Sequence, residues 1–343
     1  MTRGGRSVAG LVLALGALFS EGCSLERMAA DQMVPVLQRT RDLTNRETIP
    51  RAARESAPGL LAMLDGIVAT SPENPELRLL QAELAAGFAF AFLEAEDPAW
   101  ARAMYRKARG AARAALAEED QELSDALEGK APLAPLLAEA DEDCLPSLFW
   151  WGFARGAEIN LDRGDPAALA DLSRVDPVME WVLARDPAYY HAGPHLYSAL
   201  RRAAISPSMG GDPVKAAAHF DAVDRLTGGK LLLGRVLRAE FLAPSLAATP
   251  AGSGAAEALA AQQRAWAAFY DPLVAVLAAA DDLWPEQALL NAVAKARARR
   301  LLADPESHGI IPPPGAVNAH AAPAEEPGWG EGGGDGAWDD GGR

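Results

Sequence analysis

Few residues of this chain have the types and the spacing that a catalytic or metal-binding site requires. His191 and His195 are four positions apart and would share a transition metal if both lay on one side of a helix, but the Gly-Pro pair between them disturbs the helix that such sharing needs. We therefore interpret each as a hydrogen-bonded histidine near the start of a helix. Carboxylates gather at residues 118–122 and 141–143 without the loop spacing of a dedicated calcium site, which indicates solvated faces.

Motifs of known catalytic and phosphate-binding sites are absent from the sequence. It has no Gly-x-Ser-x-Gly nucleophile elbow, no His-Glu-x-x-His helix, no Cys-x-x-Cys pair and no Gly-Lys-Ser phosphate loop. No set of residues therefore supports an enzyme. We also expect no metal and no cofactor.

The N-terminal residues are typical of an export signal. Arg3 and Arg6 precede an apolar core at residues 8–19, which is too short to span a bilayer as a permanent helix. Gly22 and Cys23 follow this core, and the arrangement resembles the lipobox of bacterial lipoproteins. That resemblance implies a signal peptide at residues 1–22 and a diacylated Cys23 as the mature N-terminus.

An ordinary secretory signal cleaved nearby is the alternative reading of the leader. Ser24, in place of Asp, directly follows the cysteine. This resembles the signal that sends lipoproteins onward, so we expect a lipid-anchored protein on the periplasmic side of the envelope, at the outer membrane more than the inner. If Cys23 carries lipid, Cys144 has no intramolecular partner, and we interpret Cys144 as a packed thiol.

Composition and charge restrict the class of protein further. Half of the 343 residues are hydrophobic, dominated by Ala and Leu, which predicts a large buried core built from helices. The formal net charge of -15 makes a DNA or RNA partner unfavourable, so we expect no nucleic-acid binding.

Two segments, residues 97–108 and 212–223, place Asp-Pro, a small residue, an aromatic and a second small residue at identical spacing. The last three recur at i, i+4 and i+7 and so share one helix face; they are Ala101, Tyr105 and Ala108 in the first segment and Ala216, Phe220 and Val223 in the second. Asp before Pro is typical of an N-cap followed by the first helical position. The spacing predicts the second helix of a tetratricopeptide-type pair. Chance spacing in an Ala-rich chain is the alternative.

Turn residues divide the rest of the chain into expected helices, ending before an acidic Gly-rich tail at residues 305–343. That tail is too poor in apolar residues to repay ordering, which predicts disorder. The first helix is expected near residues 24–37, and polar sequence follows through Pro50. A more exposed acidic stretch is expected at 118–128. The further helices are expected at 51–70, 76–94, 97 to beyond 116, 145–161, 177–184, 189–204, 213–227, 231–241 and from 257 to 302.

Residues 145–161 form the most aromatic segment, with Phe149, Trp150, Trp151 and Phe153 within five positions. Adjacent aromatic side chains cannot all face one way on a helix. This helix therefore either touches two neighbours or lines a cavity.

Three segments resemble a known family most closely: residues 71–92, 97–109 and 186–223. Within the last, His195, the Gly-Gly-Asp-Pro run at 210–213 and the pair His219-Phe220 stand where the family pattern has them. The family is that of the TatT lipoproteins, components associated with tripartite ATP-independent periplasmic (TRAP) transporters.

The resemblance implies an all-α fold of stacked antiparallel helix pairs of tetratricopeptide-like (TPR) type, in a single helical domain at residues 23–304. Family members assemble as homotrimers around a pore, associate with a periplasmic solute-binding protein, and are proposed to carry a hydrophobic small molecule. For such a ligand or pore we expect a lining that includes Phe88, Phe92, Trp150 and Trp151. The expected function is an accessory role in TRAP transport. An envelope scaffold that binds peptides or proteins in its helical groove, without a small-molecule ligand, is the alternative.

Overall fold

The fold is described from a computed structural model, which defines residues 25–205, 211–249 and 252–316. In these three ranges all regular structure is helical and no strand occurs, which confirms the all-α class and the single helical domain. The tetratricopeptide-like pairing stays a prediction.

The helices and helical turns have the following bounds: α2 (Val34–Asn45), α3 (Pro50–Thr70), α4 (Pro75–Phe88), the π-helical turn η1 (Ala89–Leu93), α5 (Pro98–Glu119), α6 (Gln121–Leu127), α7 (Leu133–Glu139), η2 (Glu142–Cys144), α8 (Leu145–Leu161), α9 (Pro166–Ala170), α10 (Leu172–Arg185), α11 (Tyr189–Ala203), α12 (Pro213–Leu226), α13 (Leu232–Phe241), η4 (Ala243–Ala247), α14 (Ala255–Ala278), η5 (Pro285–Gln287), α15 (Ala288–Ala303) and η6 (Glu306–His308).

Several helices begin at an acidic or amide cap followed by proline. The Asp97 carboxylate accepts a hydrogen bond from the Trp100 amide at 2.9 Å, and the Asp212 carboxylate accepts one from the Lys215 amide at 3.0 Å, with proline next in the chain in both cases. Asn74 caps α4 in the same way. These side chains accept hydrogen bonds from backbone amides that have no partner within the first turn. Proline is tolerated at the first helical position because the N–H that it lacks would have no intrahelical partner there. The Asp-Pro starts expected for both repeat segments are therefore confirmed.

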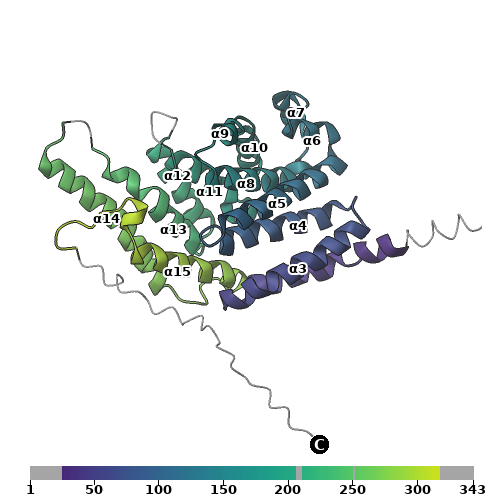
Figure 1. Cartoon of the computed structure of the whole chain (residues 1–343), viewed down its shortest axis with the longest axis horizontal. Helices are drawn as coiled ribbons and strands as arrows, with labels where there is room; N and C mark the ends of the chain where they lie inside the picture. Colours follow the sequence, from purple (N-terminus) through teal and green to yellow (C-terminus); the bar gives the residue numbers. More distant parts are fainter. Residues whose placement is uncertain (1–24, 206–210, 250–251, 317–343) are drawn as a thin grey trace, which may run out of the picture.

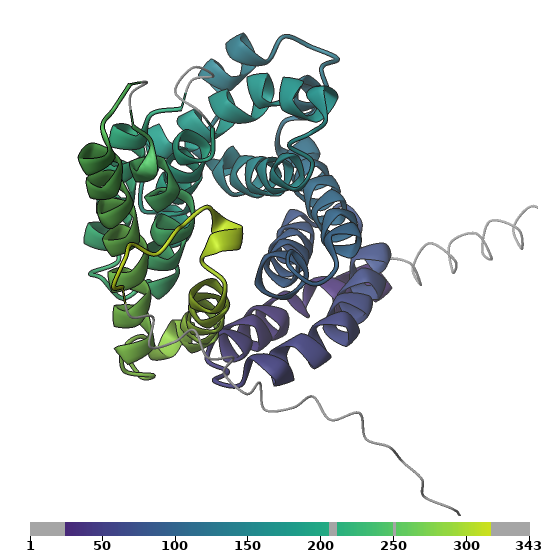
Figure 2. The same ribbon diagram turned by 60° about the vertical axis from the view of Figure 1, so that its left-hand side comes forward.

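Consecutive helices are neighbours through most of the molecule, and the succession curves into a ring. α5 packs between α4 and α8, α10 packs on α8 and α11, and α12 packs on α11 (Figure 1). The ring closes where α15 packs against α2 and α3 (Figure 2). The first and last long helices of the described chain are therefore in contact.

The core is divided among three clusters of buried side chains around this ring. One extends over α4, α5, α8 and α10, a second over α11 to α15, and a small third over α2, α3 and α4. The repeat positions of α5, Ala101, Tyr105 and Ala108, are fully buried in the first cluster, and those of α12 are at most 3% exposed in the second. Their burial agrees with one small-large-small face on each helix; their role in repeat pairing stays a prediction.

α8 and α10 approach one another closely at Gly152. A Cβ atom at this position would overlap the sulfur of Met179, which is fully buried in α10. Gly66 in α3 differs, because a Cβ atom there would meet nothing within 4 Å.

The sequence predicted that the helix ends near residue 37 and that polar sequence follows through Pro50. This end is wrong, because helix continues to Asn45. Helix α2 runs through most of this stretch because its other side buries Val34 and Leu37. Arg41 of α2 also pairs with Glu83 of α4 at 3.3 Å, which anchors the polar part of the helix to the ring.

Two further boundaries differ from the sequence prediction. The stretch at 118–128 contains α6, whose Leu123 and Leu127 are buried in the core, so this acidic segment is not simply exposed. α10 begins at Leu172 instead of Pro177, so Pro177 is the sixth residue of the helix and leaves one of its backbone hydrogen bonds unmade.

Residues 305–316 follow α15 and lie against α14. Ile310 is 1% exposed, and the Gln262 side-chain amide donates to the carbonyl oxygens of Ile311 and Pro312 at 3.2 and 3.1 Å. The leader with Cys23, and the remainder of the expected tail from residue 317, lie outside the described residues. Among the helices that the structure describes, none has the length and apolar character needed to cross a membrane.

Candidate functional site

The helical ring contains three adjoining cavities. The outer basin has a volume of about 910 Å³ and is lined mainly by η1, α8, α13, α15 and η6. The central cavity, about 240 Å³, is lined mainly by α8, α11 and α13, and the lateral cavity, about 140 Å³, by α2, α3, α4 and α15 together with Tyr190 of α11. Phe90, Arg163 and Arg297 line both the outer basin and the central cavity, and Ala91 lines all three. The cavities therefore adjoin one another and share parts of their walls.

Helix α8 supplies the aromatic wall of the central cavity through Phe149, Trp150 and Phe153. The ring centroids of Phe149 and Trp150 are 5.1 Å apart, and those of Trp150 and Phe153 are 5.7 Å apart, both edge to face. α5 and α10 both pack on the same helix. The sequence left open whether this segment touches two neighbours or lines a cavity, and it does both.

The four residues expected to line a ligand site are distributed over this system. Phe88 and Phe92, with ring centroids 6.0 Å apart, line the lateral cavity, and Phe92 also reaches the outer basin. Trp150 lines the central cavity. Trp151 lines none of the three and is 4% exposed in the core. The structure thus brings three of the four to the cavity system, and their contact with a ligand stays a prediction.

The π-helical turn η1 lies where the three cavities meet. It follows α4 directly and supplies Phe90, Ala91 and Phe92 to the cavity walls. A π turn widens a helix at the cost of regular hydrogen bonding and is frequent at functional sites. Nothing in the apolar pattern of residues 76–94 separates this turn from a continuous α-helix, so sequence reasoning missed it.

A cluster of paired charges forms one wall between the outer basin and the central cavity. Arg297 of α15 donates to both carboxylate oxygens of Glu240, at 2.7 and 3.0 Å, and its guanidinium lies 3.7 Å from Glu94. The Tyr105 hydroxyl donates to Glu94 at 2.7 Å. Burial raises the pKa of Glu94, against the opposing effects of Arg297 and the Tyr105 hydrogen bond. Burial also opposes the charge of Arg297, but the two carboxylates outweigh it and raise the pKa of Arg297.

Arg163 extends this charged wall without an ion pair among the described side chains. It donates to the side-chain oxygen of Asn160 at 2.9 Å, and its guanidinium lies 5.7 Å from the centre of the Phe241 ring. Burial lowers its pKa, although Glu240 and Glu94 act in the opposite direction. The central cavity thus combines extended apolar walls with charged groups where it adjoins the outer basin, which suits an apolar ligand with a polar group.

A second polar contact lies where the lateral and central cavities adjoin. The Tyr190 hydroxyl donates to Glu83 at 3.3 Å, and the same carboxylate pairs with Arg41. Burial raises the pKa of Glu83 and, together with the Glu83 charge, that of Tyr190. Sequence reasoning missed these residues because Tyr190 and Glu83 are 107 positions apart.

The two histidines considered for a metal point to different partners. His191 packs edge to face on Trp284 at 4.9 Å, whereas His195 lies with its Nδ1 atom 2.9 Å from Nδ1 of His219 in α12. Burial lowers the pKa values of His195 and His219, and nearby positive charges add to this. In the described part of the chain no three His, Cys, Asp or Glu residues gather closely enough to hold a metal ion.

Cys144 is a buried free thiol at the start of α8. Burial, together with nearby carboxylates, raises its pKa to about 11. A thiol that stays protonated at neutral pH is a poor nucleophile, in agreement with a packed thiol.

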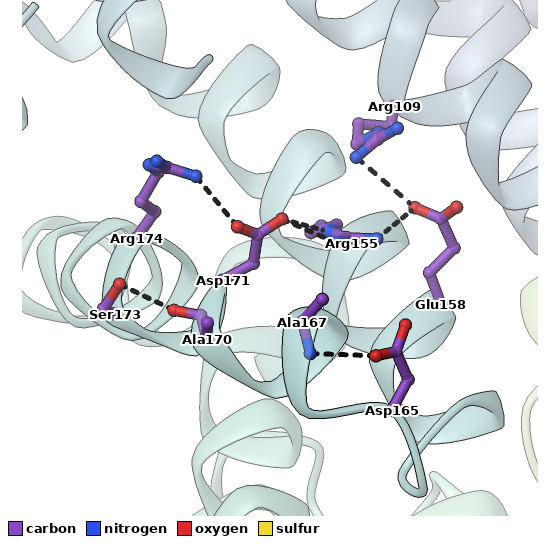
Figure 3. Close-up of polar contacts among 9 residues, drawn as sticks. All are labelled: Arg109, Arg155, Glu158, Asp165, Ala167, Ala170, Asp171, Ser173 and Arg174. Carbon is purple, nitrogen blue, oxygen red and sulfur yellow. Dashed lines mark hydrogen bonds and ion pairs between the residues drawn. The ribbon is translucent and has the colours of Figure 1, made fainter. Parts of the chain in front are cut away.

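An ion network outside the cavities connects α8 with α5 and α10 (Figure 3). Arg155 pairs with Asp171 at 2.6 Å and with Glu158 at 3.1 Å. A second arginine pairs with each carboxylate: Arg174 with Asp171 at 2.8 Å, and Arg109 with Glu158 at 3.6 Å. Each carboxylate of the network faces two arginines. We therefore interpret it as a brace that holds the aromatic helix in place.

Comparison with known proteins gives one family match. The family model described as TRAP transporter T-component matches residues 46–249, which is more than half of the chain. No curated protein matches the sequence. The matched span contains α3 to α13, and with them the aromatic wall and Tyr190, whereas α2 and α15 lie outside it.

Proposed function

This chain belongs to the TRAP transporter T-component family, and from that premise we propose that it is a lipid-anchored periplasmic accessory component that docks a solute-binding protein and holds or passes a hydrophobic small molecule. The family is one of transport accessory components and not of enzymes. The docking of a solute-binding protein and the small-molecule cargo are the proposed parts.

The observation that supports a small-molecule cargo is this group of adjoining cavities. The central cavity is walled by the aromatic side chains of α8 and by leucines of α11 and α13, and the lateral cavity by apolar side chains of α2, α3 and α4. Apolar concave space with a few placed polar groups is the usual form of a ligand site. A peptide-binding scaffold would need an open groove, whereas these cavities are bounded by helices on several sides.

Attachment to the membrane follows from the leader in this proposal. Lipid on Cys23 would lie two residues before Leu25, the first described residue, which is 62% exposed. Two acyl chains give stable anchoring where one does not. We propose the periplasmic side of the envelope, at the outer membrane, and a homotrimer as the assembled form.

Native mass spectrometry of the intact chain purified from membranes tests these proposals together. We expect a diacylated Cys23, a trimer, and an apolar molecule released on denaturation. A Cys23→Ser variant serves as the control, because it should lose the lipid mass while keeping its fold. A monomer that releases nothing, and that captures extended peptides instead of a solute-binding protein, would favour the scaffold.

A cavity-filling variant tests the cargo site itself. Ala91 lines all three cavities, so Ala91→Leu places three extra carbon atoms where they meet. We expect the affinity for the apolar fluorophore N-phenyl-1-naphthylamine to fall by about tenfold, which corresponds to about 1.4 kcal/mol. Ala99→Leu, on the exposed start of α5, is the matched control and should leave the affinity unchanged. Equal affinities for the wild type and both variants would place the fluorophore elsewhere.

A further inference from the structure

The boundary between the lateral and central cavities is formed by four residues that line both. They are Gly87, Ala91, Tyr190 and Leu290. Two of them are small, so the Tyr190 ring is the largest group at this boundary. Tyr190 lines both the lateral cavity, about 140 Å³, and the central cavity, about 240 Å³.

Tyr190 is surrounded by protein and yet incompletely covered. It leaves 39% of its surface accessible, a fraction similar to the 40% of Trp100 and well above those of Phe149 and Trp150, which it contacts. Burial is nevertheless the main reason that the pKa of its hydroxyl is raised. The accessible surface and the raised pKa are consistent with each other when the uncovered part of the ring faces the two cavities, and not bulk water.

Contacts on both sides hold the ring at this boundary. The hydroxyl donates to Glu83 at 3.3 Å, and Arg41 pairs with the same carboxylate, on the lateral side. On the central side, the ring packs edge to face on Trp150 with centroids 4.6 Å apart, and tilted against Phe149 at 5.7 Å. The ring is therefore positioned by one polar and one aromatic contact set, neither of which is covalent.

The backbone that carries Tyr190 has an uncommon conformation. Tyr190, His191 and Ala192 have φ angles of 42°, 59° and 61°, in the left-handed region that side chains other than glycine rarely adopt. Residues held in such conformations cluster at ligand sites and switch regions, where the surroundings fix them. This unfavourable segment coincides with the boundary between the two cavities.

We propose that Tyr190 determines which apolar molecules this chain holds, by dividing one elongated apolar passage into two short cavities. The wild type takes compact apolar ligands in the central cavity. An elongated hydrocarbon-like ligand enters both cavities only when the Tyr190 ring moves away from its contacts with Glu83 and Trp150. This inference rests on the proposed cargo-holding function and names the residue that sets its size selectivity.

Two fluorescent probes of different length test the proposal on the full chain. N-phenyl-1-naphthylamine is compact, and 1,6-diphenyl-1,3,5-hexatriene is a longer rod. For Tyr190→Ala we expect the affinity for the rod to rise by about tenfold while the affinity for the compact probe changes little. Tyr190→Phe keeps the ring but removes the hydroxyl that donates to Glu83, so its ratio of the two affinities should lie between those of the wild type and Tyr190→Ala. Tyr189→Ala removes the same side chain from the adjacent residue, which lines none of the three cavities, and is the matched control.

The outcomes separate this inference from the function on which it rests. If neither probe binds the wild type, the cargo-holding function fails. If the compact probe binds but Tyr190→Ala leaves the ratio of the two affinities unchanged, Tyr190 does not set the selectivity and the inference is overturned, while cargo holding stands. Should Tyr190→Ala lose its helical circular dichroism, Tyr190→Leu replaces it, with the same expected shift in the ratio and the same refuting result.

Discussion

Replacing Arg297 by methionine tests whether the charged wall of the cavity system stabilises the ring. The Arg297 side chain is 15% exposed and those of its partners Glu240 and Glu94 are 14% and 16% exposed, so the cluster is largely removed from water. Methionine keeps much of the volume but removes the two hydrogen bonds to Glu240. It also leaves two carboxylates facing the cavity without their shared cation.

The expected cost is that of breaking a buried ion pair from one side, about 3–5 kcal/mol. Replacing both partners, in Arg297→Met with Glu240→Leu, should cost less than Arg297→Met alone, because no charge is left unpaired in that contact. Arg299→Met, at an exposed position on the same helix, is the matched control and should change the free energy of unfolding by less than about 0.5 kcal/mol.

The cost should also depend on pH with a defined sign. Burial already raises the pKa of Glu94, and Arg297 is the first influence that opposes it. A carboxyl whose pKa is higher in the folded than in the unfolded state destabilises the fold above its unfolded pKa, and this penalty is relieved as pH falls through the folded value. Loss of Arg297 widens the difference, so the deficit of the variant should be larger near pH 7.5 than near pH 5.

Urea unfolding followed by circular dichroism at the two pH values measures these differences. Two results would contradict a stabilising role for Arg297. One is an Arg297→Met variant within about 1 kcal/mol of the wild type near pH 7.5. The other is a double variant that is less stable than the single variant, which would mean that an unpaired Glu240 carboxylate is not the main cost of Arg297→Met.

Three further predictions concern stability. Asp97→Ala should lower the free energy of unfolding by about 1 kcal/mol, since it removes the cap of α5, whereas Asp97→Asn should be nearly neutral; thermal denaturation distinguishes them. Gly152→Ala should destabilise the protein by about 1–3 kcal/mol, because the added Cβ atom overpacks against α10. Gly66→Ala has open space around it and should stabilise the protein by about 0.5–1 kcal/mol. The melting temperature should therefore fall for the first variant and rise for the second. Because burial lowers the pKa values of His195 and His219 below their unfolded value, their protonation should cost stability as pH falls below about 6.5, and His219→Asn should flatten that part of the pH profile of unfolding.

The sequence predicted the features that depend on short stretches of chain. Helix starts at Asp97 and Asp212 were predictable because the cap and the proline act within one turn. The bounds of α8 were predictable because apolar residues fill it between two clear terminators. Helix α2 was missed because its stability depends on Val34 and Leu37 packing against the ring, and its own polar residues conceal that.

Features of the candidate site that join distant segments were not predictable. Arg297 and Glu240 are 57 positions apart, and Tyr190 and Glu83 are 107 apart. Neither pair has a local sequence signal, since an arginine near a helix C-terminus or a glutamate in an amphipathic helix has ordinary local explanations. The left-handed turn at Tyr190 was hidden for a related reason, because its residues lack the glycine that normally marks such a conformation.

Closure of the ring explains why the cavities exist at all. The aromatic wall belongs to α8, within the span matched by the family model, but Leu290 and Arg297 of α15 complete the central cavity and lie beyond that span. The lateral cavity likewise needs Leu37 and Arg41 of α2, which precede the matched residues. A stack of helix pairs alone would leave the rings of α8 facing an open concave surface. The contact of α15 with α2 and α3 adds further walls to that surface. The proposed holding of a small molecule therefore depends on the two flanking helices as much as on the matched span.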